Sequence, residues 1–188
     1  MQKKLNMIQL MLNQILVSCK EQWNLALTQK KHPYRFFALG TAHNSKPGVR
    51  TVVLRDFNST SMEFTIFTDA RSSKVLSLKN NPEIALLFYD PETHIQIRVD
   101  ARCVLIKNDD KLFNKQSPTS QNDYTTTLAP GTPIDSISSV SFLKEHNHFM
   151  KLVFEASKID FLQLNRVNHT RAVFEKVNSI WQGKFRIP

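Results

Sequence analysis

Glycine is scarce in this chain, with only Gly40, Gly48, Gly131 and Gly183 among its 188 residues. No GxGxxG or GxxxxGK[ST] pattern passes through these positions, which excludes the glycine-loop forms of dinucleotide and triphosphate binding. A phosphate group bound by this chain would therefore have to be held by cationic side chains and hydroxyls.

Cysteine and long apolar runs are also in short supply. Cys19 and Cys103 lie far apart, which excludes a disulfide scaffold and a cysteine-rich zinc site and suits a reducing cytoplasm. We predict no bound metal, because His146, His148 and His169 lack carboxylate partners at ligand spacing. No run of about 18 apolar residues occurs, so no membrane-spanning helix is expected.

The N-terminal segment has two possible interpretations. Leu16-Val17-Ser18-Cys19 could be a lipoprotein cleavage site, but polar amides interrupt the apolar run that such a signal needs. Apolar residues instead recur at helical spacing from Leu5 to Leu27, through the candidate cleavage site. We therefore predict an amphipathic helix, in one piece or broken near Lys20, that ends before Pro33.

The charge is strongly positive. Twenty-five Lys and Arg residues against 16 Asp and Glu give a net charge of +9, and the first fifty residues contain a single acid, Glu21. Such a chain could bind nucleic acid, bind an anionic small ligand, or merely have a basic surface. It has no RGG tract, long basic run or zinc-finger spacing, so we do not expect a nucleic-acid partner.

The rest of the chain alternates between short apolar runs and turn residues, which is typical of antiparallel strands. We expect strands at 34–42, 49–57, 62–68, 83–89, 94–108, 151–164, 171–177 and 179–187, and short helices at 72–80, 109–115 and 141–146. Residues 116–139 are aperiodic, as in functional or mobile loops. The fold class is mainly β with flanking helices, and a closed antiparallel barrel would hide the edges of the sheet.

Three features could form a ligand site. Residues 67–74 are expected to run from a strand into a helix, where free N–H groups, two serines and Lys74 could hold a phosphate or simply cap the helix. Arg50 and Arg55 flank one strand and face opposite ways unless a bulge intervenes. Gln96 shares a strand face with Arg98, where its amide could meet a heterocycle or only solvent.

Taken in order, these segments resemble a known family. Arg50-Thr-Val-Val-Leu-Arg55, Phe67-Thr68, Ser72-Ser73-Lys74, Asn81-Pro82 and Gln96-Ile-Arg-Val99 are similar to the FMN-binding half of pyridoxamine 5′-phosphate oxidase. Residues 117–124 and 130–133 resemble a subfamily of related flavoproteins with less defined substrates, and 161–171 with 181–188 resemble the family's closing segment. The resemblance implies a split β-barrel, an FMN cofactor and a homodimer with FMN at the subunit interface.

The resemblance also implies roles for individual residues. The implied cofactor-binding residues are Arg50, Thr51, Val52, Val53, Leu54, Arg55, Phe67, Thr68, Ser72, Ser73, Lys74, Gln96 and Arg171. The implied substrate-binding residues are Arg55, Phe113, Ser117, Ser120 and His169, and no catalytic residue is assigned.

Several positions depart from the family pattern. Ser73 stands where the family has a phosphate-binding arginine, Arg55 replaces a lysine, and Phe113 and Ser117 fall near a family Tyr and Arg. The family's arginine before His-x-Arg falls near Val167, or at Arg166 if the alignment shifts. FMN binding therefore matches the family better than a vitamin B6 substrate does.

The expected function is that of a cytoplasmic, homodimeric, FMN-dependent oxidoreductase with a small-molecule substrate that the sequence does not define. Residues 1–188 are expected to form a single FMN-binding domain, with a helical segment at 1–31 and closing strands at 150–188. A non-catalytic flavin-binding module and a basic nucleic-acid-binding barrel are the alternatives.

Overall fold

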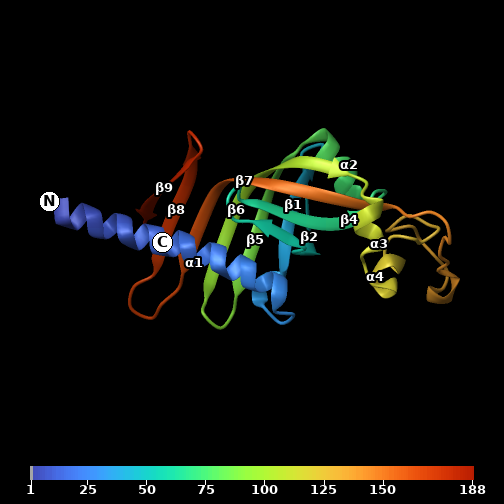
Figure 1. The fold of residues 1–188 in the computed structure, drawn as a ribbon, viewed down its shortest axis with the longest axis horizontal. Helices are drawn as coiled ribbons and strands as arrows, with labels where there is room; N and C mark the ends of the chain where they lie inside the picture. The colour runs from blue at the N-terminus through green and yellow to red at the C-terminus, as the bar shows by residue number, and fades with distance from the viewer. Residues whose placement is uncertain (1) are drawn as a thin grey trace.

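The computed structural model describes residues 2–188, which form one large antiparallel sheet with helices against one face and at one end (Figure 1). The strands are β1 (Phe36–His43), β2 (Lys46–Val53), β3 (Asp56–Asn58), β4 (Glu63–Asp69), β5 (Glu83–Asp90), β6 (Ile95–Lys107), β7 (Phe149–Gln163), β8 (Thr170–Val177) and β9 (Ile180–Arg186). The helices are α1 (Gln2–Thr28), η1 (Pro33–Arg35), α2 (Ser73–Asn80), α3 (Asp110–Asn114), α4 (Pro118–Asn122) and η2 (Ile137–Ser139).

Strand β7 connects the two halves of the sheet. Its first half, residues 149–155, pairs with β4, and its last residues, 158–163, pair with β8. Along its other edge β7 pairs with β6 over most of its length. The main strand order is β2-β1-β5-β6-β7-β4-β3, and β8 and β9 extend the sheet from the far part of β7.

The sheet is not closed, so the expected closed barrel is wrong, whereas the antiparallel, mainly β class with flanking helices is confirmed. Hydrogen bonding ends at β2 on one edge and at β3 on the other. The chain changes partners between these two strands, because the Leu54 N–H donates to the Arg35 carbonyl and the Arg55 N–H donates to the Thr65 carbonyl. The single strand predicted at 49–57 is therefore two strands.

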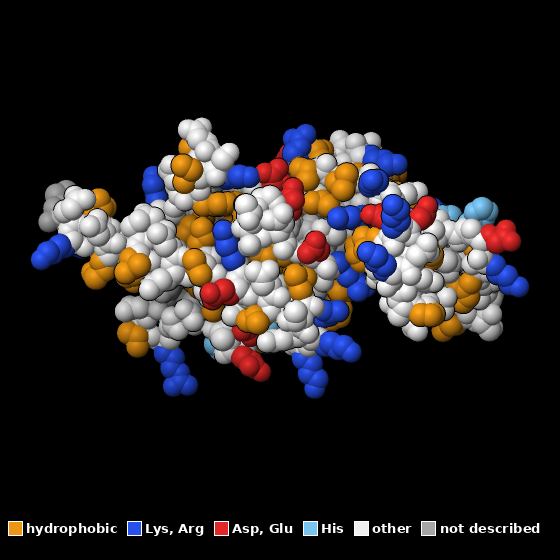
Figure 2. Space-filling model, in the orientation of Figure 1, with side chains coloured by type: hydrophobic (Ala, Val, Ile, Leu, Met, Phe, Trp, Pro, Cys, Tyr) orange, Lys and Arg blue, Asp and Glu red, His pale blue; other side chains and the backbone are white. Residues whose placement is uncertain are grey.

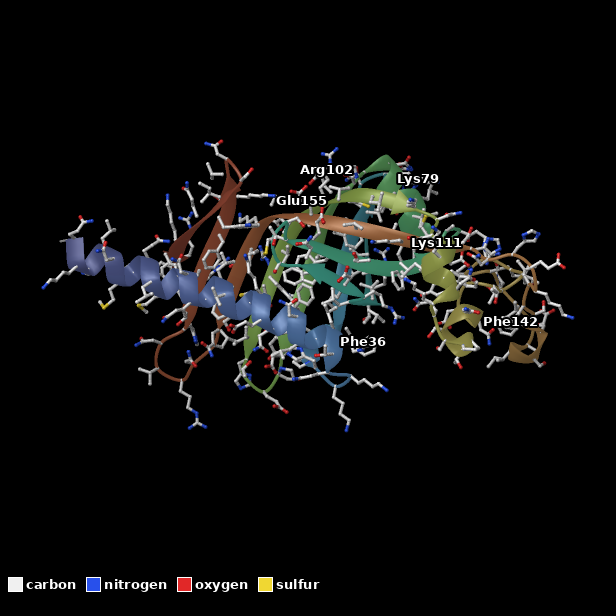
Figure 3. All side chains as sticks on the ribbon, viewed as in Figure 1. Phe36, Lys79, Arg102, Lys111, Phe142 and Glu155 are labelled. Atoms are coloured by element: carbon white, nitrogen blue, oxygen red, sulfur yellow. The ribbon has the colours of Figure 1, made fainter. Side chains whose placement is uncertain are left out.

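The segment between β6 and β7, residues 108–148, contains a second difference. The helix predicted at 141–146 is absent from the described chain. Thr126 forms an isolated bridge with Phe142, and the N–H groups of Thr127 and Leu143 donate to the carbonyls of Ser141 and Thr125. Backbone pairing between two stretches of this segment therefore uses the groups that a helix would need. Figure 3 places Phe142 at the opposite end of the molecule from β8 and β9.

The inner face of the sheet packs against α1 and forms the core. Trp23 is fully buried, with its ring 5.2, 4.9 and 5.6 Å from those of Phe57, Phe64 and Phe88. Helix α1 continues without a break through Cys19, and burial raises the pKa of that thiol to about 12. None of the helices found in residues 2–188 combines the length and apolar character that crossing a bilayer requires.

Gly183 allows α1 to lie closely against the hairpin formed by β8 and β9. A Cβ atom at this position would lie 2.6 Å from the Phe174 ring and 3.4 Å from the Leu12 Cβ. Phe174 and Leu12 are both buried, so neither side chain can move into free space. The absence of a side chain at residue 183 is therefore a condition for this contact.

Replacing Gly183 by alanine should lower the free energy of unfolding by about 1–3 kcal/mol, because the added methyl group overpacks the contact. Gly40→Ala is the matched control, since its Cβ would meet its nearest atom at an ordinary 3.5 Å. Denaturant unfolding of both variants measures the difference. Equal stability of the two would contradict this account of the helix contact.

Candidate functional site

Two cations and two hydroxyls meet at one end of the inner face, where β1, β2, β4 and α2 come together. Arg50 reaches this point because alternate residues of β2 face inward. It lies opposite Leu39 of β1, and Gly48 lies opposite Thr41. Its Nη1 donates to Thr41 Oγ1 at 2.7 Å and to the carbonyls of Gly48 and Leu39 at 3.1 and 3.3 Å. These bonds fix the guanidinium of Arg50 at the rim of the core.

Lys74 approaches the same place from the first turn of α2. Its Nζ donates to Thr68 Oγ1 at 2.8 Å, and Thr68 Oγ1 lies 3.1 Å from Ser72 Oγ. Ser72 occupies the N-cap position of α2, but within the described chain its side chain makes no capping hydrogen bond. The Ser72 hydroxyl instead meets Thr68, and both residues are buried.

The cluster formed by Arg50, Thr68, Ser72 and Lys74, here called the cation cluster, has no counter-ion within the described residues. Burial is the main cause that lowers the pKa of Lys74, the charge of Arg50 lowers it further, and Asp69 opposes both. Burial also lowers the pKa of Arg50. Among residues 2–188 neither cation forms an ion pair. Two partly buried cations with adjacent hydroxyls fit a phosphate dianion.

Gly48 and Thr41 position Arg50, and neither was singled out as a site residue from the sequence. A Cβ on Gly48 would lie 2.8 Å from Nη2 of Arg50, so the guanidinium folds over a residue without a side chain. Gly48 lies directly opposite Thr41 in the hairpin of β1 and β2. The turn at 43–48 was recognisable in the sequence, and the hairpin register that follows from it could have revealed this pair.

Arg55 belongs to a different cluster on the other side of β4. Its guanidinium lies over the Phe67 ring at 5.6 Å, and the Phe149 ring beyond is 4.9 Å from Phe67, 5.0 Å from Tyr124 and 5.9 Å from Phe113. Burial raises the pKa of Tyr124, and Arg55 opposes that shift through its charge and a hydrogen bond. Phe67 and Thr68 point to opposite sides of β4, so Arg55 and Arg50 enter separate clusters.

Arg71 ties the cation cluster to the segment between β6 and β7. Its Nε and Nη2 donate to the two oxygens of Asp69 at 3.0 and 2.7 Å. The same guanidinium donates to the carbonyls of Thr126 and Thr127 at 2.9 and 3.1 Å. Because Asp69 is occupied by Arg71, it does not neutralise Lys74 directly.

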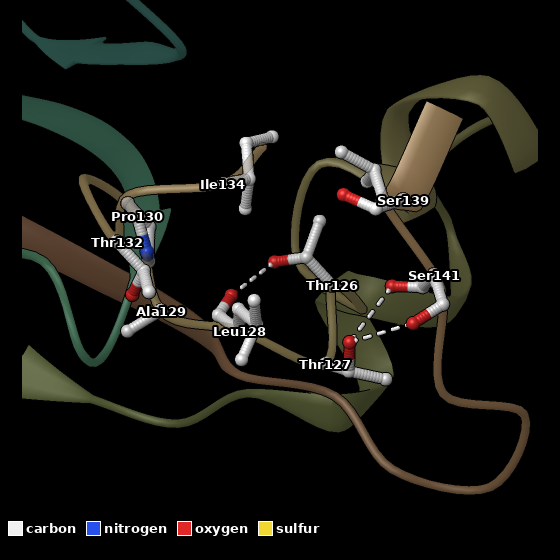
Figure 4. Close-up of a pocket in the computed structure, with 10 residues that line it drawn as sticks. Thr126, Thr127, Leu128, Ala129, Pro130, Thr132, Ile134, Ser139 and Ser141 are labelled. Atoms are coloured by element: carbon white, nitrogen blue, oxygen red, sulfur yellow. Dashed lines mark hydrogen bonds between the residues drawn. The ribbon is translucent and has the colours of Figure 1, made fainter. Parts of the chain in front are cut away.

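The anchored segment encloses a small cavity of about 140 Å³ (Figure 4). Thr127 Oγ1 lies 2.8 Å from Ser141 Oγ across the cavity wall. The lining residues are Thr126, Thr127, Leu128, Ala129, Pro130, Thr132, Ile134, Ser139, Val140 and Ser141. They include none of the residues predicted as cofactor or substrate ligands, so this cavity and the cation cluster are different features.

Gln96 and Arg171 lie at the far end of β7. Both are directly opposite Leu162, from β6 and β8 respectively, so they share one face of the sheet. Arg171 donates to both oxygens of the buried Asp160 at 3.0 and 2.8 Å, and these hydrogen bonds are the main cause that lowers the pKa of Asp160. Arg98 contacts the same carboxylate at 3.5 Å.

Thr68 lies at one end of β7, and Gln96 and Arg171 lie at the other end. Thr68 is opposite Met150 of β7, whereas Gln96 and Arg171 are opposite Leu162, twelve residues further on. At the usual rise per strand residue this corresponds to roughly 35–40 Å along the strand. Figure 1 shows the same separation, with α2 at one end of β7 and β8 at the other. Arg50 lies between these two ends, because it is opposite Leu39, Leu39 is opposite Leu86, and Leu86 is opposite Val99, three residues from Gln96.

The remaining predicted residues have local roles. Thr51 and Val53 face away from the core, Val52 and Leu54 face into it, and Ser73 is exposed. Ser117 caps α4 by accepting from the Ser120 N–H, and the two hydroxyls lie 3.1 Å apart. His169 Nδ1 accepts from the Asn165 N–H in the turn between β7 and β8. Arg55 and Phe113 therefore border one aromatic cluster, but His169 lies far from it.

Comparison with known proteins identifies the family. A family model of the FMN-binding domain of pyridoxamine 5′-phosphate oxidase matches residues 16–107. Pyridoxine/pyridoxamine 5′-phosphate oxidase 2 of Arabidopsis thaliana is 31% identical over 136 residues, covering 64% of this chain and 69% of that protein. The Acinetobacter baumannii pyridoxine/pyridoxamine 5′-phosphate oxidase is 38% identical over 85 residues, covering 45% of this chain and 38% of that protein.

Two solved structures share the fold. A pyridoxamine 5′-phosphate oxidase-related, FMN-binding protein from Nostoc punctiforme has a TM-score of 0.74 at 22% identity, covering 88% of this chain and 95% of that one. PhzG from Burkholderia lata, solved with tetrahydrophenazine-1-carboxylic acid, has a TM-score of 0.74 at 16% identity, with 92% of each chain covered. The chain belongs to the pyridoxamine 5′-phosphate oxidase-related family of FMN-binding proteins, and its cofactor is FMN.

Replacing Lys74 by methionine should weaken FMN binding at least tenfold, because one charge-assisted contact is worth roughly 1.5–3 kcal/mol. The ligand-free protein should be as stable as the wild type or more stable, because a buried, unpaired charge is removed. Fluorescence titration and thermal unfolding measure the two effects. Lys79→Met, at an exposed site on the same helix, is the control. Equal FMN affinity of the two variants would refute the role of Lys74.

The affinity for FMN should fall as pH rises through the pKa of Lys74, because a phosphate dianion favours the protonated amine. In the ligand-free protein this pKa lies below the ordinary value of 10.5. A lowered pKa in the folded state also means that stability rises with pH through the same window, since the unfolded chain then binds more protons. The ratio of dissociation constants of Lys74→Met and wild type removes effects common to both. A ratio that stays constant from pH 7 to 10.5 would contradict this account.

Proposed function

We propose that this protein is an FMN-dependent oxidoreductase in which Arg50, Thr68, Ser72 and Lys74 hold the FMN phosphate. The observation that carries the proposal is the pair of partly buried cations without a counter-ion. A phosphate dianion would accept charge-assisted hydrogen bonds from both and would offset the cost of burying them. Membership in an FMN-binding family agrees with this assignment.

We further propose that the flavin ring is bound by Gln96 and Arg171 of a second copy of the chain. The position of Gln96 and Arg171 at the end of β7 opposite to Thr68 supports this division of the site between two copies. A two-fold axis would bring the far end of one copy to the cation cluster of the other, forming two equivalent sites. The Gln96 amide could then hydrogen-bond the edge of the flavin ring.

The face of the sheet opposite the core supports such a dimer. This face, here called the open face, exposes Phe36, Val49, Leu87 and Tyr89, of which Val49 is 73% exposed. Apolar patches of this kind on a soluble protein mark interaction sites. The same face includes Arg98 and Arg171 around Asp160, next to Gln96. The ligands proposed for the partner's flavin therefore lie on the proposed interface.

Bound FMN would supply the two-electron chemistry, and the protein would supply binding, orientation and electrostatics. The cation cluster fixes the phosphate, and Gln96 of the second copy orients the ring. The cluster of Arg55, Phe67 and Tyr124, anchored to residues 108–148, is the proposed border of the substrate site. The free Cys19 and Cys103 support a reducing compartment such as the cytoplasm.

Light scattering and an FMN titration test the proposal together. The FMN-loaded protein should contain at least two chains per particle, with an interface above about 1,600 Å². It should also oxidise or reduce a small molecule in a substrate screen. A monomer that retains FMN would refute the shared site, and an FMN-loaded dimer that transfers no electrons to any donor or acceptor would favour a non-catalytic flavin-binding module.

Oxidation of pyridoxamine 5′-phosphate should be absent, or at least a hundredfold slower than in an enzyme specialised for it. Recognition of a second phosphate needs several cationic side chains, but Ser117 is occupied in capping α4 and Phe113 packs against Phe149. Each lost charged contact costs on the order of 2 kcal/mol. A steady-state peroxide assay on FMN-saturated protein measures the rate. Efficient turnover with a micromolar KM would show that Arg55, Arg166 or His169 supplies the missing contacts.

A further inference from the structure

Helix α1 has a second apolar stripe on the side that faces away from the core. Its buried side contains Leu12, Cys19, Trp23 and Ala26, which pack against the sheet. On the other side Met7 and Leu10 are each 58% exposed and Val17 is 52% exposed. Figure 2 shows orange side chains along the protruding end of this helix. An isolated helix in water gains nothing from a second apolar face, so a partner is expected there.

The spacing of the exposed stripe is that of a helix-pairing seam. Residues 3, 7, 10, 14, 17 and 21 are separated by four, three, four, three and four positions, which keeps them on one face. They are Lys3, Met7, Leu10, Gln14, Val17 and Glu21, and all six are exposed. The apolar positions therefore lie in the middle of the seam, and one charge of each sign lies at its ends.

This arrangement is complementary to itself in one orientation. If two copies of α1 pair antiparallel about a two-fold axis at the level of residue 12, Lys3 meets Glu21 at both ends. Met7 then meets Val17, and Leu10 meets Gln14, again twice. A parallel arrangement would place Lys3 against Lys3 and Glu21 against Glu21, which is unfavourable. Among residues 2–188 neither charge is in an ion pair within its own chain.

We propose that the Lys3–Glu21 stripe of α1 is an association surface for a second copy of this chain, through an antiparallel helix pair. This surface is separate from the open face of the sheet and does not depend on bound flavin. Dimers formed through the open face would therefore be joined in pairs into particles of four chains.

Sedimentation velocity of the full chain tests the proposal with charge and apolar variants. Leu10→Asp should halve the number of chains per particle, because it buries a carboxylate in the middle of the seam. Gln9→Asp, one residue away and outside the stripe, is the matched control and should have no effect. Circular dichroism checks that both variants keep the helix, which is expected because residues 9 and 10 are exposed.

The charge pairs allow a rescue experiment. Lys3→Glu and Glu21→Lys should each weaken association about tenfold at low salt, because two attractive contacts become repulsive. The double variant Lys3→Glu/Glu21→Lys should return to within about twofold of wild type, since the pairs are restored in reverse. Lys4→Glu carries the same charge change as Lys3→Glu outside the stripe and should leave association unchanged.

Results of three kinds would overturn the proposal. One is a Leu10→Asp particle with as many chains as the wild type. Another is a double charge variant that associates as weakly as the single variants, or a Lys4→Glu effect equal to that of Lys3→Glu. The third is loss of binding to vesicles of anionic phospholipid in Leu10→Asp with unchanged self-association, which would assign the stripe to a membrane surface.

Discussion

The feature on which the proposed site depends is the placement of two cations, Arg50 and Lys74, at the rim of the core without a carboxylate to neutralise them. Burial lowers the pKa of both, and the charge of Arg50 lowers that of Lys74 further. Asp69 is near but is held by Arg71. Such an arrangement costs stability in the ligand-free protein, and a bound anion would compensate for it. Local conflict of this kind is typical of functional sites.

The surrounding residues maintain this arrangement. Gly48 leaves room for the guanidinium of Arg50, and Thr41 accepts a hydrogen bond from it. The hydroxyls of Thr68 and Ser72 keep the Lys74 amine in place without neutralising it. In the proposed site, side chains from three strands and one helix would hold the phosphate, which glycine-rich loops hold through backbone N–H groups.

The length of β7 is the second constraint. This strand of 15 residues pairs with β4 near the cation cluster and with β8 near Arg171. In the proposed dimer, one chain would offer the phosphate end of one site at the β4 end of β7 and the ring end of the other site at the β8 end. The open face, with its exposed apolar residues, offers the surface through which two such half-sites could meet.

The sequence predicted the family, the FMN cofactor and the residues of the cation cluster, because these rest on short motifs whose chemistry is local. Thr68, Ser72 and Lys74 are joined by hydrogen bonds, and Arg50, from another segment, is close enough for its charge to lower the pKa of Lys74. The strand spacing indicated that Arg50 and Arg55 face opposite ways, but it did not predict that Arg55 would lie against Phe67. That outcome depends on the change of partner at Leu54, which is a tertiary event.

Other differences have similar causes. The helix expected at 141–146 does not form in the described chain, because its backbone pairs with residues 125–127, which no local pattern indicates. The open edges at β2 and β3 could not be foreseen either, since closure depends on the curvature of the whole sheet. In contrast, the continuous helix through Cys19 followed directly from apolar spacing, because α1 packs along one side over most of its length.

A mixed dimer tests the shared site most directly. One copy carries Lys74→Met and the other carries Gln96→Leu. Each copy has its own affinity tag, so that two purification steps in sequence isolate the mixed dimer. FMN binding to the mixed dimer is then titrated and compared with that of both parent homodimers. If each site takes its phosphate ligands from one copy and its ring ligands from the other, one site of the mixed dimer contains both defects and the other contains none. The account therefore predicts half a molecule of FMN per chain bound with wild-type affinity, which neither parent shows. A mixed dimer without any wild-type site would contradict the account, because each flavin would then be held by a single chain.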